Sequence, residues 1–116
     1  MIDVAVIGAR GYTGAELLPL LHRHPEFNVM AVGSGSAAGD PVTDHVAGME
    51  GCPLEFANIQ PVDLPGLGAD ACVLALPNGA AGPYVAALDE QRPDTVIVDL
   101  GADYRFDESW TYGQPE

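Results

Sequence analysis

The amino-acid sequence predicts an α/β fold in which helices cover both faces of a doubly wound, mostly parallel β-sheet. Three observations support this fold class. Four apolar runs are nearly unbroken, as expected for strands covered on both faces. Stretches with the apolar spacing of helices lie between some of these runs. The first run leads into a loop with glycine at every third residue, and such strand–helix alternation favours a right-handed parallel sheet.

The first part of the chain supplies two strands and one helix. We expect a strand at residues 2–7 and a helix over about residues 12–22, whose leucines form a wide apolar face. Pro19 allows a kink or a new turn within this helix, and Pro25 ends it. The second strand is expected at residues 28–33.

The second part begins with a polar connection and then returns to a regular pattern. The connection, at residues 37–68, suggests one helical turn near 42–46, a short strand at 54–57 and a turn at 61–66. Buried strands are then expected at residues 71–76 and 95–100. Between them we expect a helix over about residues 80–88, whose firm start is delayed by Gly82 and Pro83.

The glycine-rich loop after the first strand is the main candidate for ligand binding. Gly8, Gly11 and Gly14 permit positive φ and a close approach to the backbone. The helix that follows directs unpaired N–H groups and the positive end of its dipole toward the same point. The loop therefore predicts binding of a dinucleotide pyrophosphate. An ordinary glycine-rich turn is the alternative, because the spacing is not the strict G-x-G-x-x-G.

The end of the second strand favours NADP over NAD. NAD-binding folds usually place an acid there for the ribose 2′-hydroxyl, whereas this chain has Gly-Ser-Gly-Ser and no acid before Asp40. Ser34 and Ser36 can donate hydrogen bonds to a 2′-phosphate, and Arg10 can reach it from the glycine-rich loop. The alternatives are a flexible Gly-Ser turn and an ordinary surface arginine.

Charge and composition limit the classes of partner. The formal net charge is −13 and the chain has no lysine, so we expect neither nucleic acid nor a membrane as a partner. No apolar run can span a bilayer and no basic segment precedes the first strand, so a cytoplasmic location is expected. His22 and His24, two residues apart, do not share a helix face, and no metal site is expected.

Neither cysteine is expected to be a nucleophile. Cys72 lies inside an apolar run and is predicted to be a core residue. Cys52 lies in a predicted loop with no base nearby in the sequence. Both thiols are expected to be free, as is usual in a cytoplasmic protein. His45 is expected to form a solvated pair with the adjacent Asp44.

Several motifs together resemble the N-acetyl-γ-glutamyl-phosphate reductase family of arginine biosynthesis. The resemblance covers almost the whole chain and rests on segments in the same order at residues 8–17, 23–26, 74–79, 99–105 and 112–116. It implies NADPH-dependent reduction of an acyl phosphate to an aldehyde. In that reaction a cysteine thiolate attacks the substrate, phosphate leaves, and hydride reduces the thioester.

The resemblance also implies how the activity is divided along a longer polypeptide. Residues 1–116 correspond to the N-terminal NAD(P)-binding domain, and the nucleophilic cysteine is expected beyond Glu116, so this chain alone should be inactive and holds no catalytic residue. The missing domain is expected to mediate homo-oligomer formation. Two alternatives stay open: a lysine-biosynthesis relative that acts on a similar acyl phosphate, and a stand-alone regulatory module that binds a dinucleotide.

The family pattern, carried over residue by residue, implies a set of site residues. The cofactor-binding residues are Gly8, Arg10, Gly11, Tyr12, Thr13, Gly14, Ser34, Ser36, Leu76 and Pro77. Asp103 and Arg105 border the implied substrate cleft, with Arg105 as a phosphate contact. The chain departs from the family at Asn78, where many members have histidine, and at Gly35 and Asp40, where basic residues are common.

Overall fold

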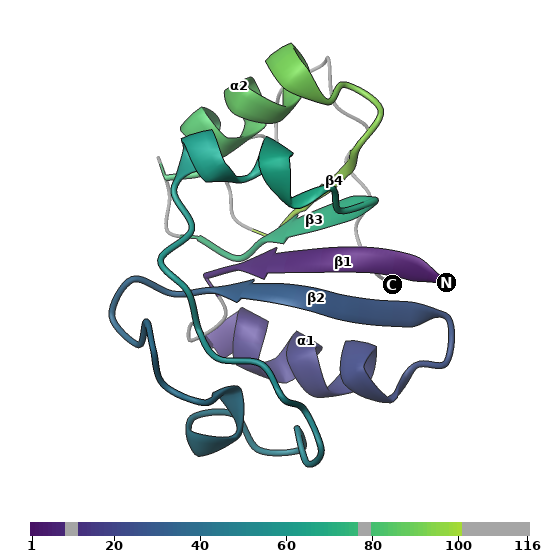
Figure 1. Cartoon of the computed structure of the whole chain (residues 1–116), viewed down its shortest axis with the longest axis vertical. Coiled ribbons are helices and arrows are strands. Elements are labelled where there is room, and N and C mark those ends of the chain that lie inside the picture. Colours follow the sequence, from purple (N-terminus) through teal and green to yellow (C-terminus); the bar gives the residue numbers. More distant parts are fainter. Residues whose placement is uncertain (9–11, 77–79, 101–116) are drawn as a thin grey trace.

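The fold is built on a four-stranded sheet in which all neighbouring strands are parallel. The computed structural model describes residues 1–8, 12–76 and 80–100, with the backbone alone at 12–14. In spatial order the strands are β2 (Phe27–Gly33), β1 (Ile2–Ile7), β3 (Ala71–Leu74) and β4 (Val96–Asp99), as Figure 1 shows. This arrangement confirms the predicted parallel α/β fold.

Two helices cover opposite faces of the sheet. α1 (Tyr12–Arg23) follows β1, and α2 (Gly82–Gln91) lies between β3 and β4 in the chain. Because successive strand residues point to opposite faces, the core divides into two clusters. The cluster on the α1 side includes Val4, Val6, Leu18 and Val32. The cluster on the α2 side includes Ala5, Ile7, Leu74, Val85 and Leu88. The sheet is therefore doubly wound.

The helix boundaries agree with most of the sequence-based expectations. α1 begins at Tyr12 and continues through Pro19 to Arg23 as one helix. α2 begins at Gly82 with a proline in its first turn, which confirms the delayed start. Neither these helices nor any other described helix is long and apolar enough to cross a membrane.

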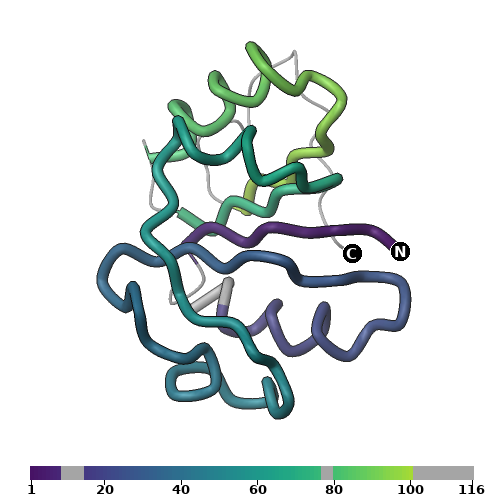
Figure 2. Tube along the Cα trace, in the orientation of Figure 1, coloured from purple at the N-terminus to yellow at the C-terminus, as the bar shows by residue number. Residues whose placement is uncertain are grey.

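The connection from β2 to β3 contains three short 3₁₀ turns: η1 (Val42–Asp44), η2 (Pro61–Asp63) and η3 (Pro65–Leu67). The strand expected at 54–57 is reduced to two isolated bridges, Pro41 with Glu55 and Gly33 with Ala57. Figure 2 shows this connection passing the carboxyl ends of the strands on its way from the α1 side to the α2 side. Its position brings residues distant in sequence to the end of β1.

The expectation of a buried strand at 95–100 is wrong in part. β4 covers only Val96–Asp99, and the side chains of Val96 and Val98 are 60% and 42% exposed. The cause is position: β4 is one of the two edge strands of the described sheet, and these two valines face the α1 side, where α1 packs against β1 and β2. An apolar run by itself does not distinguish an edge strand from a central one.

Candidate functional site

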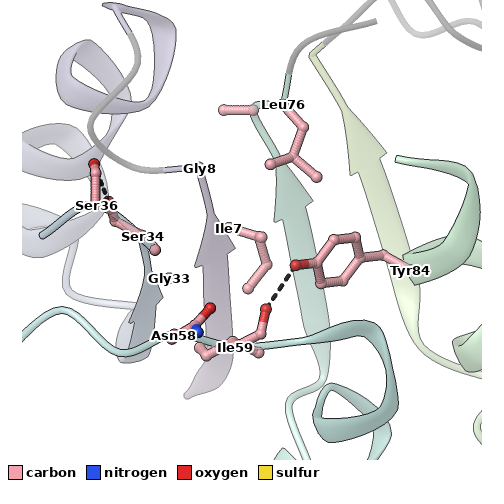
Figure 3. Close-up of a pocket in the computed structure, with 11 residues that line it drawn as sticks. Ile7, Gly8, Gly33, Ser34, Ser36, Asn58, Ile59, Leu76 and Tyr84 are labelled. Carbon is pink, nitrogen blue, oxygen red and sulfur yellow. Dashed lines mark hydrogen bonds between the residues drawn. The ribbon is translucent and has the colours of Figure 1, made fainter. Parts of the chain in front are cut away.

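A pocket of about 270 Å³ opens at the carboxyl ends of β1, β2 and β3. It lies where the chain order reverses, since β2 pairs with one side of β1 and β3 with the other. Ligands of open parallel sheets bind at such a reversal point. The lining residues, shown in Figure 3, are Ile7, Gly8, Gly33, Ser34, Gly35, Ser36, Asn58, Ile59, Ala75, Leu76 and Tyr84.

Gly8 allows β1 and β3 to approach closely at the top of the pocket. Its φ is +84°, in the left-handed region. A Cβ at this position would overlap the carbonyl oxygen of Ala75 and stand 3.0 Å from Cδ2 of Leu76. The Gly8 amide donates to the carbonyl of Gly33 at 2.9 Å, which also ties the loop start to β2. Glycine is therefore required here by packing as well as by backbone conformation.

The two serines after β2 form the polar side of the pocket. Ser34 is only 9% exposed, and its amide donates to the carbonyl of Ala57 at 2.9 Å. The hydroxyl oxygens of Ser34 and Ser36 are 3.4 Å apart. The segment is thus held in place by Ala57, which argues against a freely flexible Gly-Ser turn. Its hydroxyls can donate hydrogen bonds to an anionic ligand.

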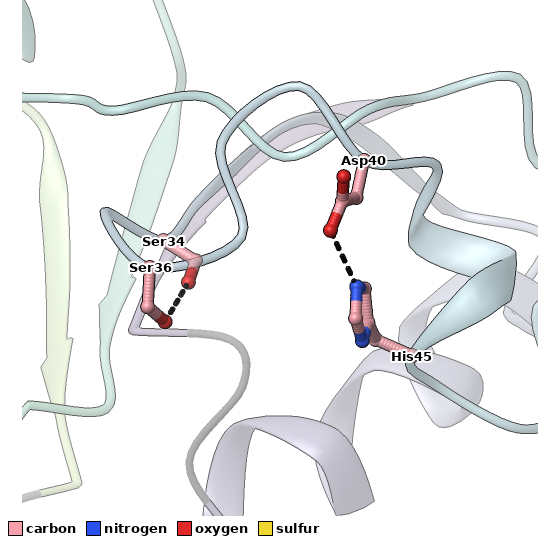
Figure 4. Close-up of polar contacts among 4 residues, drawn as sticks. All are labelled: Ser34, Ser36, Asp40 and His45. Carbon is pink, nitrogen blue, oxygen red and sulfur yellow. Dashed lines mark hydrogen bonds and ion pairs between the residues drawn. The ribbon is translucent and has the colours of Figure 1, made fainter.

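The first acid after these serines is held by a histidine. The Asp40 carboxylate lies 2.8 Å from Nε2 of His45, whose ring also packs against Phe56 at a centroid distance of 5.7 Å. Figure 4 shows the carboxylate turned toward His45 and away from the serines. The expected pairing of His45 with Asp44 is therefore wrong. The loop before η1 brings the Asp40 carboxylate to the His45 ring instead.

The floor of the pocket and the side across from the serines come from residues that sequence analysis missed. Asn58 and Ile59 belong to the irregular connection, and Tyr84 belongs to α2. The Tyr84 hydroxyl donates to the Ile59 carbonyl at 2.6 Å. Burial raises the pKa of Tyr84, and the charge of Asp63 raises it further. Only the apolar spacing of the helix singles out this tyrosine in the sequence, and Asn58 carries no local signal.

The sequence-predicted residues are distributed between described and undescribed parts of the chain. Gly8, Ser34, Ser36 and Leu76 line the pocket together. The backbone of Tyr12, Thr13 and Gly14 forms the first turn of α1, directly after the glycine-rich loop. The remaining predictions, Arg10, Gly11, Pro77, Asp103 and Arg105, lie outside the described residues.

The cysteines behave as predicted. Cys72 is 1% exposed in the core, and burial raises the pKa of its thiol to about 11 despite the lowering influence of Arg92. Cys52 is half-buried in a loop and packs against the α1-side core. Both thiols are free. Neither lines the pocket, and Tyr84 is the one titratable side chain among its described lining residues.

These features define a class of protein. A parallel sheet with a reversal point, a glycine at the end of β1 and a pocket across the strand ends characterise the Rossmann-like dinucleotide-binding domains. Residues 3–116 match the family described as the semialdehyde dehydrogenase NAD binding domain, and the chain belongs to that family.

Curated relatives extend the comparison. The N-acetyl-gamma-glutamyl-phosphate reductase of Stenotrophomonas maltophilia is 49% identical over 113 residues, which cover 97% of this chain and 35% of the relative. The enzyme of the same name from Xylella fastidiosa is 46% identical, over 97% of this chain and 34% of the relative. The chain thus spans about a third of the length of the curated relatives it matches.

A solved structure shows the same fold. The aspartate semialdehyde dehydrogenase of Candida albicans, determined with NADP, superposes with a TM-score of 0.69. The superposition covers 92% of this chain and 31% of that one, with 24% sequence identity. The likeness confirms the Rossmann-like architecture.

Proposed function

We propose that this chain is the cofactor-binding part of an NADPH-dependent N-acetyl-γ-glutamyl-phosphate reductase, which forms N-acetylglutamate semialdehyde. The observation that carries the proposal is the pocket at the strand ends, where Gly8, Ser34, Ser36 and Leu76, which the sequence resemblance assigns to the cofactor, lie together. The 49% identity to a named reductase over 97% of the chain supports the same activity.

The described residues suit a dinucleotide. Gly8 follows β1 directly, a few residues before the first turn of α1, where unpaired N–H groups attract a pyrophosphate. Ser34 and Ser36 offer hydroxyl donors, and Leu76 offers an apolar contact. When bound, NADPH supplies the hydride. We extend the cofactor assignment to Arg10, Gly11, Tyr12, Thr13, Gly14 and Pro77, and the substrate-cleft assignment to Asp103 and Arg105.

The choice of NADP over NAD is supported by the absence of an acid among the described lining residues. A carboxylate there would repel a 2′-phosphate. Asp40, the nearest acid after β2 in sequence, is engaged by His45. The structural neighbour from Candida albicans was solved with NADP, which favours the same choice.

The remaining parts of the proposal concern the whole enzyme. We propose a small-molecule acyl phosphate as substrate, attacked by a cysteine supplied beyond Glu116, and a cytoplasmic homo-oligomer assembled through a second domain. The net charge of −13 supports the view that neither nucleic acid nor an anionic membrane is a partner.

Calorimetric titration of the chain with NADPH and with NADH tests the proposal. We expect NADPH to bind more tightly than NADH. Arg10→Glu should weaken NADPH by about 1–3 kcal/mol more than NADH, as for loss of a charged contact. The matched control is Arg23→Glu, which makes the same charge change at the other end of α1. Absence of NADPH binding at millimolar concentration would refute the cofactor assignment.

A further inference from the structure

The pocket wall formed by Asn58 and Ile59 belongs to no strand or helix. On its N-terminal side it is anchored to β2, because the Ala57 amide donates to the Val32 carbonyl at 3.0 Å and the Ala57 carbonyl accepts from the Ser34 amide at 2.9 Å. Beyond Ala57 the bonds to β2 stop: the Ile59 amide donates back to the Ala57 carbonyl at 3.1 Å, and η2 begins only at residue 61. The wall is therefore a short bridge between two anchored parts of the chain.

Side chains hold this bridge. The Tyr84 hydroxyl donates to the Ile59 carbonyl at 2.6 Å, and the Gln60 side-chain amide donates to Oδ1 of Asn58 at 2.6 Å. Tyr84 lies on α2, and its ring packs against the α2-side core, so the helix and the core hold the ring in place. A tyrosine hydroxyl is protonated, and able to donate, at neutral pH, and burial raises the pKa of Tyr84 further.

Figure 3 shows the Tyr84 hydroxyl pointing across the pocket floor to Ile59, with the serines on the far side. The two sides of the pocket differ in chemistry. One side carries the hydroxyls of Ser34 and Ser36, and the other carries apolar atoms of Ile59 and Leu76 with the Tyr84 ring. A phosphorylated ribose suits the first side and a flat aromatic base suits the second.

The described pocket is too small to enclose a whole dinucleotide. Pockets for drug-sized ligands measure roughly 300–1,000 Å³, and this one measures about 270 Å³. Because the hydroxyl-bearing segment follows β2, the half that it fits is the adenosine end.

We infer that Tyr84 is a positioning residue for the adenosine half of the cofactor: its hydrogen bond to Ile59 fixes the wall that faces the serines. The inference rests on the proposed function. The ring of Tyr84 lines the pocket, whereas its hydroxyl acts indirectly, by holding the Ile59 backbone beside the base.

The test compares Tyr84→Phe with the unaltered chain. The variant keeps the ring and loses the hydroxyl, so we expect faster amide hydrogen exchange at Ile59 and Gln60. We expect affinity for adenosine 2′,5′-bisphosphate to fall about two- to tenfold, as for loss of one hydrogen bond, and affinity for reduced nicotinamide mononucleotide to stay unchanged. A general loss of stability would weaken both fragments alike.

Thr95→Val is the matched control. It removes a buried hydroxyl that has no hydrogen-bond partner among the described residues, just before β4 at the opposite end of the sheet. It should change neither fragment's affinity. If Tyr84→Phe does not fold, Gln60→Ala removes the other side-chain bond to the wall, and we expect it to produce the same selective loss.

The outcomes distinguish failure of the positioning role of Tyr84 from failure of the proposed function. If the unaltered chain binds NADPH but Tyr84→Phe keeps full affinity for adenosine 2′,5′-bisphosphate, or loses both fragments equally, the positioning role is overturned and the proposed function stands. If the unaltered chain binds neither NADPH nor the bisphosphate, the proposed function is overturned and the inference falls with it.

Discussion

Replacing Gly8 by alanine tests how closely β1 and β3 must approach beside the pocket. The new Cβ would overlap the Ala75 carbonyl oxygen and lie 2.9 Å from the carbonyl carbon. A side chain in the path of the new Cβ could rotate away, but the backbone carbonyl of Ala75 is held by the pairing of β1 with β3 and cannot. The strands must therefore separate locally, or the loop that follows Gly8 must shift.

The expected loss of stability has two parts. An alanine at the φ of +84° observed for Gly8 costs about 1–2 kcal/mol. Separation of β1 and β3 weakens the hydrogen bond from the Ala75 amide to the Ile7 carbonyl at 2.8 Å, and a shift of Gly8 weakens its own bond to the Gly33 carbonyl of β2 at 2.9 Å. Each bond is worth about 0.5–1.5 kcal/mol. Together these effects predict a loss of about 2–5 kcal/mol, a large share of the roughly 5–15 kcal/mol that stabilises a small domain.

Gly51→Ala provides a matched control. Its φ is +85°, and a Cβ there would meet nothing within 4 Å. Urea unfolding should therefore show a loss of about 1–2 kcal/mol for Gly51→Ala, from backbone strain alone, and a larger loss for Gly8→Ala. NADPH affinity should fall in the Gly8 variant only. Equal losses of stability in the two variants would refute the argument from close approach.

Three further predictions concern the pocket and the core. Gly35→Ala places a Cβ 3.6 Å from Oδ1 of Asn58, an ordinary contact distance. The free energy of unfolding should therefore change by less than about 0.5 kcal/mol, while calorimetry shows weaker NADPH binding. Unchanged NADPH affinity would contradict the assignment of this pocket to the cofactor. His45→Ala frees the Asp40 carboxylate and should weaken NADPH relative to NADH by up to about 1 kcal/mol, an effect that Asp40→Asn should abolish. Iodoacetamide at pH 8 should leave Cys72, with its thiol pKa of about 11, unmodified in the folded chain, as mass spectrometry can check. The free energy of unfolding should also fall as pH rises from 9 toward 11, because the thiol then ionises in the unfolded state only. Urea titration across this pH range checks the second point.

The sequence by itself determined the sheet, the strand-end glycine and the serine segment. The apolar run at residues 2–7 favours a strand that is covered on both faces. Gly8 has a positive φ, which glycine adopts without strain. The run of Gly-Ser-Gly-Ser follows the second strand directly, so its place at the carboxyl edge follows from parallel topology. Each of these features is encoded by neighbouring residues, and for that reason each was predictable.

Only the tertiary structure decided which distant residues complete the site. The exposure of Val96 depends on the edge position of β4, and the partner of His45 depends on the path of the loop. Tyr84 meets Ile59 across 25 residues of sequence because α2 and the later part of the β2–β3 connection pack together on the same face of the sheet. Local periodicity specifies burial and backbone conformation, whereas contacts between separate segments depend on packing of the whole chain.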